Sequence, residues 1–211
     1  MRNAARFLLV AVAFLALPAH ADLYEDFIIA VNNDRVVQVR EFLAKGVDAN
    51  TVGPNGEPAL VLAARAGYVG TVDALLAAKA NVNARSPVGD SAIMAAALSG
   101  HLDLVKKLRA RGAEINNTGW SPLTYAATGG HDAVVEYLLA EGANVNAVSP
   151  NGTSALMMAV REGKVSTVTL LIAKGADVNQ KNQAGGTALA WATRGNEQGM
   201  ATQLRRAGAK E

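Results

Sequence analysis

The stretch GWSPLTYAATGGHDAVVEYLLAEGANVNA, from Gly119 to Ala147, decides the fold because its pattern recurs along the chain. Every copy ends in a tripeptide with a final asparagine, and these asparagines are spaced by 33, 33, 30 and 33 residues: Asn50, Asn83, Asn116, Asn146 and Asn179. An apolar anchor keeps the same order: Leu60, Ile93, Leu123, Leu156 and Leu189. A fixed period of this length predicts a stacked repeat architecture.

Each copy predicts a turn, two short helices and a second turn. A serine or threonine stands where it would cap the first helix, at Ser91, Ser121, Ser154 and Thr187. A glycine follows the second helix, as is usual at a left-handed helix stop, at Gly46, Gly112, Gly142, Gly175 and Gly208. Lys79 replaces this glycine in the second copy, so we expect local strain or a different cap there.

These residues resemble the ankyrin repeat, whose pattern is G-x-T-P-L-H-x-A-A-x-x-G-H followed by a second helix ending in L-L-x-x-G-A-x-x-N. The resemblance implies an all-α ankyrin-repeat solenoid of about six helix-turn-helix units, with short β-hairpin fingers along one side. The expected units are 22–50, 51–83, 84–116, 117–146, 147–179 and 180–211. One unit cannot bury its apolar faces alone, so the units must stack, and the two end units need polar outer faces.

Residues 1–21 have the pattern of a secretory signal peptide. Arg2 and Arg6 give a basic start, an apolar run follows from Phe7 to Leu17, and a small-x-small motif ends at Ala21. The apolar run is shorter than the roughly 20 residues that a spanning helix needs, which disfavours the alternatives of a membrane anchor or a buried helix. We therefore expect cleavage after Ala21 and no membrane insertion of the mature chain. A short leader on a chain without cysteine favours a bacterial periplasm, and the resemblance is to ankyrin proteins of the exported bacterial type.

Composition disfavours several classes of function. The chain has 20 Lys and Arg against 18 Asp and Glu, and Arg2 and Arg6 fall in the leader, so the mature chain has 18 of each. A neutral chain offers no general electrostatic attraction for nucleic acid. The absence of cysteine excludes thiol catalysis and cysteine-bound metals. We expect a monomer.

Histidine, serine and carboxylate positions do not predict an enzyme. His101 and His131 each open a second helix after a glycine, where the ankyrin pattern itself places histidine, so we expect both to bond to nearby backbone. They should lie about 10 Å apart, one helix-packing distance, which is too far to share a zinc ion. The Ser and Thr residues are expected caps, and no phosphate loop is present. The prediction is therefore no catalytic residue, no metal and no cofactor.

A partner-binding surface can be read from the register. The first exposed position of the first helices holds Arg65, Leu98, Thr128, Arg161 and Arg194, and the position before the capping residue holds Glu57, Asp90 and Trp120 in the second to fourth units. Three residues are missing between Asn116 and Gly119, which should leave a notch beside Trp120, floored by Leu98, Thr128 and Gly129. An aromatic residue flanked by arginines is typical of an interface hot spot. The alternative is that Trp120 folds over the shortened loop and fills the space. Trp191 shares a register with Tyr125 and is predicted to face the core.

The sequence therefore predicts a non-catalytic protein–protein interaction module that binds a partner protein through its concave face. By analogy with exported ankyrin proteins, the partner would be an envelope enzyme that needs an accessory factor, or a toxin that this protein neutralises. The alternatives are a scaffold that tethers several envelope proteins, or a small-ligand-binding protein or enzyme.

Overall fold

The computed structural model describes residues 18–117 and 119–210. Within these ranges it holds twelve helices and no strand, which confirms the all-α solenoid. The helices are α1 Pro18–Asn32, α2 Val36–Ala44, α3 Ala59–Ala66, α4 Val69–Ala77, α5 Ala92–Leu98, α6 Leu102–Ala110, α7 Pro122–Gly129, α8 Asp132–Ala140, α9 Ala155–Arg161, α10 Val165–Ala173, α11 Ala188–Arg194 and α12 Gln198–Arg206. The predicted signal peptide lies mostly outside the described residues, and α1 runs through the expected cleavage site after Ala21.

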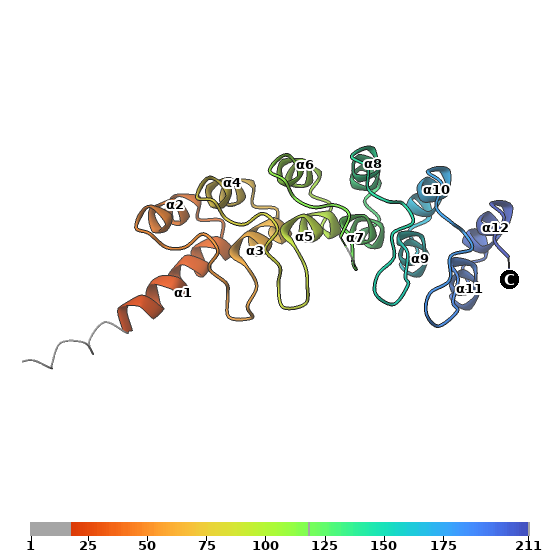
Figure 1. Cartoon of the computed structure of the whole chain (residues 1–211), viewed down its shortest axis with the longest axis horizontal. Helices are drawn as coiled ribbons and strands as arrows, with labels where there is room; N and C mark the ends of the chain where they lie inside the picture. Colours follow the sequence, from red (N-terminus) through yellow and green to blue (C-terminus); the bar gives the residue numbers. More distant parts are fainter. Residues whose placement is uncertain (1–17, 118, 211) are drawn as a thin grey trace, which may run out of the picture.

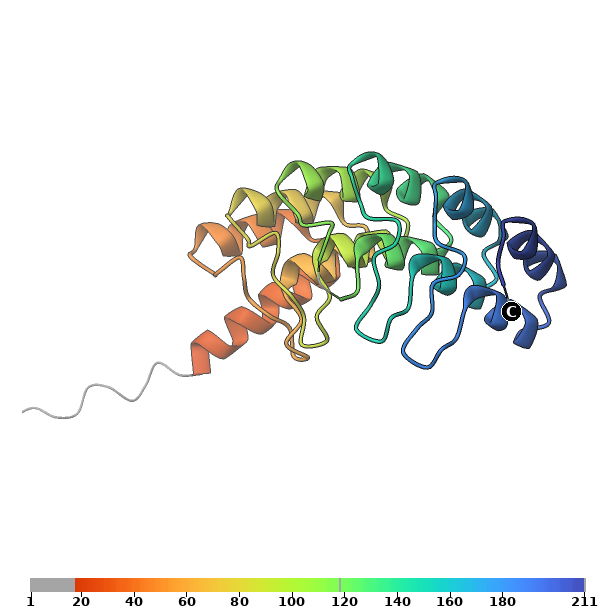
Figure 2. The same cartoon turned by 45° about the vertical axis from the view of Figure 1, so that its right-hand side comes forward.

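The helices form two rows (Figure 1). The odd-numbered helices form an inner row that carries the loops, or fingers, and the even-numbered helices form an outer row. The stack bends so that the outer row lies on the outside of the curve (Figure 2). The five apolar anchors of the repeat are all buried in the core with at most 1% exposure: Leu60, Ile93, Leu123, Leu156 and Leu189. Stacking is therefore what stabilises each short helix pair.

The fingers are simpler than the predicted hairpins. A single antiparallel bridge closes each of three fingers, between Val52 and Pro58, Arg85 and Ser91, and Val148 and Ser154. The finger before α7 shows no such bridge among its described residues, and its loop is visibly shorter than its neighbours (Figure 1). The three missing residues thus shorten one finger and leave the helices that follow in register.

Three of the four predicted helix caps are confirmed. The side-chain oxygens of Ser121, Ser154 and Thr187 accept from the backbone N–H groups three residues later. The prediction for Ser91 is wrong, because its hydroxyl is buried without a hydrogen bond to any residue that the structure describes. The backbone of Ser91 has the same extended conformation as the other caps, so the difference lies in the rotation of its side chain.

The repeated asparagines tie each helix pair to the next. Four of them donate Nδ2 to the carbonyl of the following stop glycine, at Asn83, Asn116, Asn146 and Asn179. Asn50 departs from this pattern and donates Nδ2 to Asp48 Oδ1 at 3.1 Å. The stop residue that Asn50 would face is Lys79, which holds a left-handed φ of 65°. The predicted irregularity at Lys79 is therefore confirmed.

We expect Lys79→Gly to raise the free energy of unfolding by about 1 kcal/mol, because glycine adopts a left-handed φ without the steric cost that a Cβ atom brings. The midpoint of urea denaturation measures the change. Gly112→Lys is the matched control, since Gly112 is the equivalent residue one repeat later and has a φ of 89°, and it should shift the midpoint the other way. A lower midpoint for Lys79→Gly would contradict the strain argument.

Candidate functional site

A small apolar pocket lies on the inner side, beside the shortened finger. Leu98, Trp120, Tyr125, Thr128 and Met158 line a cavity of about 190 Å³. Trp120 meets Tyr125 edge-on, with ring centroids 6.1 Å apart and planes at 76°. The Thr128 hydroxyl donates to the Thr124 carbonyl at 2.8 Å, so it is occupied within α7. We call this cavity the Trp120 pocket; it offers an incoming side chain apolar contact rather than hydrogen bonds.

Gly129 supports the Trp120 pocket from behind and does not line it. A Cβ atom at Gly129 would lie 2.4 Å from His131 Cδ2 and 2.6 Å from the Leu98 carbonyl oxygen. His131 Nε2 lies 2.9 Å from that same carbonyl oxygen, and His101 Nε2 lies 3.2 Å from the Arg65 carbonyl oxygen. Both histidines therefore bond to backbone, as predicted. The His131 contact fixes the end of α5, and with it Leu98, against α7.

Hydrogen-bonded charged residues border the Trp120 pocket toward the N-terminus. The Tyr125 hydroxyl donates to Asp90, and burial together with this hydrogen bond raises the pKa of Tyr125 well above its usual value. Arg65 Nη1 donates to Glu57 Oε2 at 2.8 Å, and the pKa of Arg65 is raised mainly by this hydrogen bond. Glu57, Arg65 and Asp90, three of the predicted contact residues, are thus already engaged within the chain.

A second pocket lies nearer the C-terminus on the same side. Arg161 and Arg194 line it together with Trp191, Val160, Gly195 and Glu197, and its volume is about 350 Å³. We call it the Trp191 pocket. Arg161 Nε donates to Glu162 at 2.9 Å, whereas the Arg194 side chain makes no hydrogen bond or ion pair with any residue in the described ranges.

The prediction that Trp191 faces the core is wrong. Its ring is only partly buried, because α11 is the last inner helix and no further helix covers its C-terminal side. Tyr125 stands 66 residues earlier in the same register and also lines a pocket. This shared register is the signal that could have identified both aromatic residues as surface features. Met158 could not be found this way, since it is 3% exposed and touches the Trp120 pocket only from below.

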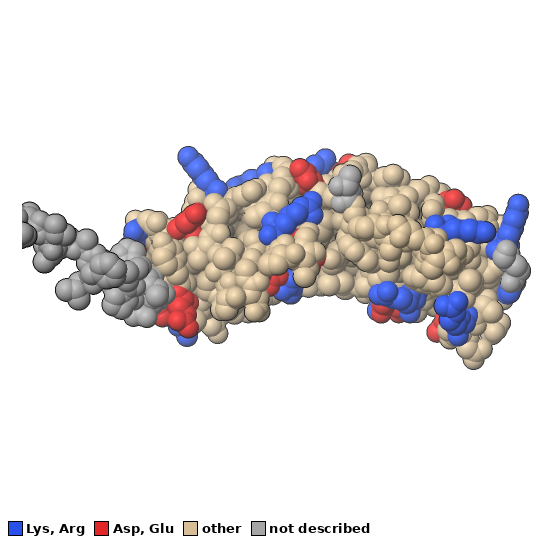
Figure 3. Space-filling view, turned by 60° about the horizontal axis from the view of Figure 1, so that its bottom comes forward, with Lys and Arg blue, Asp and Glu red and all other residues tan. Residues whose placement is uncertain are grey.

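The structure separates the eight predicted contact residues into groups. Leu98, Trp120 and Thr128 share the Trp120 pocket, and Arg161 and Arg194 share the Trp191 pocket. The remaining three form the hydrogen-bonded border described above. Figure 3 brings the finger side forward and shows an uncharged stretch in the middle of the molecule, with charged side chains on either side along its lower edge.

The described residues contain no cluster of three or more His, Asp or Glu side chains placed to hold a metal ion. None of the helices between residues 18 and 210 is both long and apolar enough to cross a bilayer.

Comparison with protein families agrees with this geometry. The family model for ankyrin repeats in three copies matches residues 27–118, 79–149 and 141–210, which together span nearly all of the repeat region. The chain belongs to the ankyrin repeat family. Ankyrin repeat proteins are protein–protein interaction modules and are typically not catalytic, and both statements hold for this ankyrin array at the level of its family. A comparison with curated proteins found no match.

Proposed function

We propose that this ankyrin protein binds a partner protein through its concave face, with the Trp120 pocket as the main anchor. The observation that carries the proposal is an apolar cavity of about 190 Å³ with an aromatic wall, in the middle of the inner row. A cavity of roughly 150 Å³ is large enough to hold a benzene ring. The Trp120 pocket therefore has room for one aromatic or branched aliphatic side chain of a partner, which is typical of an interface hot spot.

The Trp191 pocket supplies a second contact along the same face. Tyr125 and Trp191 lie on α7 and α11, which are two helix-packing steps apart, or about 20 Å at 8–10 Å a step. An extended chain covers this distance in about six residues at 3.3 Å each. Arg161 and Arg194 give the Trp191 pocket a polar rim, where charged contacts adjust orientation and association rate more than affinity.

We further propose export to a bacterial periplasm, with cleavage after Ala21. The support is the leader pattern of residues 1–21 and the absence of cysteine. Cleavage there would remove the first four residues of α1 and leave Asp22 as the N-terminus. The partner would then be an envelope protein, either an enzyme that needs an accessory factor or a toxin to be neutralised.

In-cell photocrosslinking tests face and location together. A photoreactive residue replaces Leu98 on the concave face or, as the control, Lys174 at the end of α10 on the outer row. The expected result is one adduct from the Leu98 position in the periplasmic fraction, on a chain that begins at Asp22, with none from Lys174. An adduct from Lys174 alone would contradict the concave face, and an uncleaved chain in the cytoplasm would contradict export.

A further inference from the structure

A second hollow lies on the outer row, on the opposite side from the fingers. It is a trough of about 760 Å³ over α4, walled by α2 and α6. Its lining residues are Arg40, Leu43 and Ala44 from α2, Asp73, Ala74, Ala77 and Ala78 from α4, and Lys107 and Arg111 from α6. We call it the α4 trough.

The trough exists because α4 is poor in long side chains. Ala74 stands in the register that holds Glu41 in α2 and Lys107 in α6, and Ala78 stands where the flanking repeats have Lys45 and Arg111. The surface of α4 is therefore lower than that of its two neighbours. Small side chains at a helix surface also allow another helix to approach its backbone closely.

The walls of the trough carry an excess of positive charge. Lys107 Nζ is neutralised by Asp73, whose two carboxylate oxygens lie 2.6 and 2.7 Å away. The side chains of Arg40 and Arg111 are exposed and make no ion pair or hydrogen bond with any residue of the described chain. The lining thus holds three cations and one carboxylate in a chain that has equal numbers of each without its leader.

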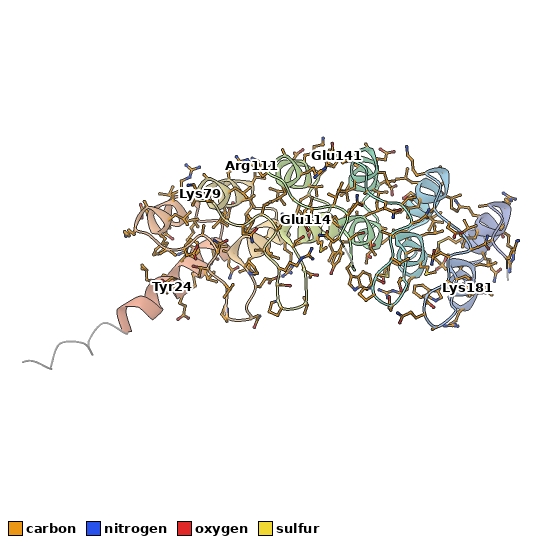
Figure 4. The ribbon with its side chains drawn as sticks, in the orientation of Figure 1. Tyr24, Lys79, Arg111, Glu114, Glu141 and Lys181 are labelled. Atoms are coloured by element: carbon orange, nitrogen blue, oxygen red, sulfur yellow. The ribbon has the colours of Figure 1, made fainter. Side chains whose placement is uncertain are left out.

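Nearby carboxylates do not neutralise Arg111. Figure 4 shows Lys79, Arg111 and Glu141 along one edge of the stack, at the ends of successive outer helices. Glu141 lies 3.2 Å from Arg109 Nε, and Glu114 lies 3.8 Å from Arg85. Lys79, at the end of α4, adds a further positive charge beside the trough.

We propose that the α4 trough binds an acidic helical segment of a second protein. The alanine floor admits the small-residue face of a helix, and Arg40 and Arg111 supply bidentate donors for carboxylates at its edges. An anionic membrane is disfavoured because such surfaces are recognised by about four to eight Lys or Arg residues, and here Lys107 is already paired. Because this site lies opposite the concave face, the ankyrin array would hold two proteins at once, which favours the scaffold alternative.

The test uses a fluorescein-labelled synthetic peptide of about 15 residues, long enough to form a helix, with glutamates on one face and alanines on the other. Fluorescence anisotropy with the purified protein in low-salt buffer should show saturable binding. The double variant Arg40→Gln/Arg111→Gln and the trough-filling variant Ala77→Leu should each weaken binding by about tenfold or more. Lys174→Gln, which removes an exposed cation in the register of Arg111 on α10, should leave binding unchanged, as should Trp120→Ala on the other face.

All of these positions are exposed except Trp120, and an unchanged circular dichroism spectrum establishes that each variant is folded. Equal losses from Lys174→Gln and from the arginine pair would overturn the site, as would equal binding of a peptide with scrambled glutamate positions. A protein that ignores the peptide but sediments with phosphatidylserine vesicles through Arg40 and Arg111 would overturn it in favour of a lipid site. Loss of Leu98 crosslinking in cells, with peptide binding intact, would instead count only against the concave-face function.

Discussion

Trp120→Ala is expected to weaken binding of the concave-face partner by about 30-fold or more. A hot-spot tryptophan is worth at least about 2 kcal/mol of binding free energy, which corresponds to that factor. Trp120 and Tyr125 form one wall of the Trp120 pocket, so removing the indole opens the pocket to solvent and exposes the edge of Tyr125. The measurement is the dissociation constant for the partner identified by crosslinking at Leu98.

The competing role for Trp120, filling the space of the shortened finger, makes a different prediction for the same variant. A tryptophan that acts as core loses about 3–5 kcal/mol of stability on truncation to alanine. Trp120 is only partly buried, so we expect urea denaturation to show a much smaller loss. Trp120→Phe, which keeps an aromatic wall, should retain most of the affinity. A fall of about 3 kcal/mol in the free energy of unfolding, with unchanged affinity of the folded protein, would favour the filling role.

Gly129→Ala is expected to destabilise the fold by about 1–3 kcal/mol, the usual cost of overpacking. Its new Cβ would come within 2.6 Å of the Leu98 carbonyl oxygen, a backbone atom, and within 2.4 Å of the His131 ring. Relief of the clash would require α7 to move away from α5. The hydrogen bond between His131 and the Leu98 carbonyl would lengthen or break as a result.

Gly195→Ala is the matched control because Gly195 holds the same register two repeats later. A Cβ atom there would meet nothing closer than 3.3 Å, and the residue lies in the right-handed helical region. We expect this variant to be neutral or slightly stabilising, since alanine has less conformational freedom than glycine in the unfolded chain. Urea denaturation of both variants gives the comparison. Equal midpoints would show that the contact between α5 and α7 has room for the extra methyl group.

The 33-residue period was enough to predict the helix pairs, their order and the buried anchors, because stacking makes each repeat repeat its neighbour's contacts. The left-handed stop at Lys79 was also predictable, since the glycine it replaces has a fixed conformational role. The rotation of the Ser91 side chain was not predictable, because its backbone matches that of the caps that do form.

The site was predictable only in part. Register placed Leu98, Trp120 and Thr128 together because all three follow from the repeat and the deletion. It misplaced Trp191 because a position that is covered within the stack becomes open at the last repeat. The α4 trough depends on what flanks Ala74 and Ala78 in space, and alanine is common enough in helices that its presence gave no signal.

The two concave pockets have one spectroscopic consequence. The chain has only two tryptophans, and Trp120 lines one pocket while Trp191 lines the other. Intrinsic fluorescence of the unlabelled protein therefore reports on the concave face, because a bound side chain that displaces water from an indole moves its emission to shorter wavelength. The lining of the α4 trough contains no aromatic residue, so occupancy there leaves this emission unchanged. The protein thus carries its own optical reporter for distinguishing a ligand of one face from a ligand of the other.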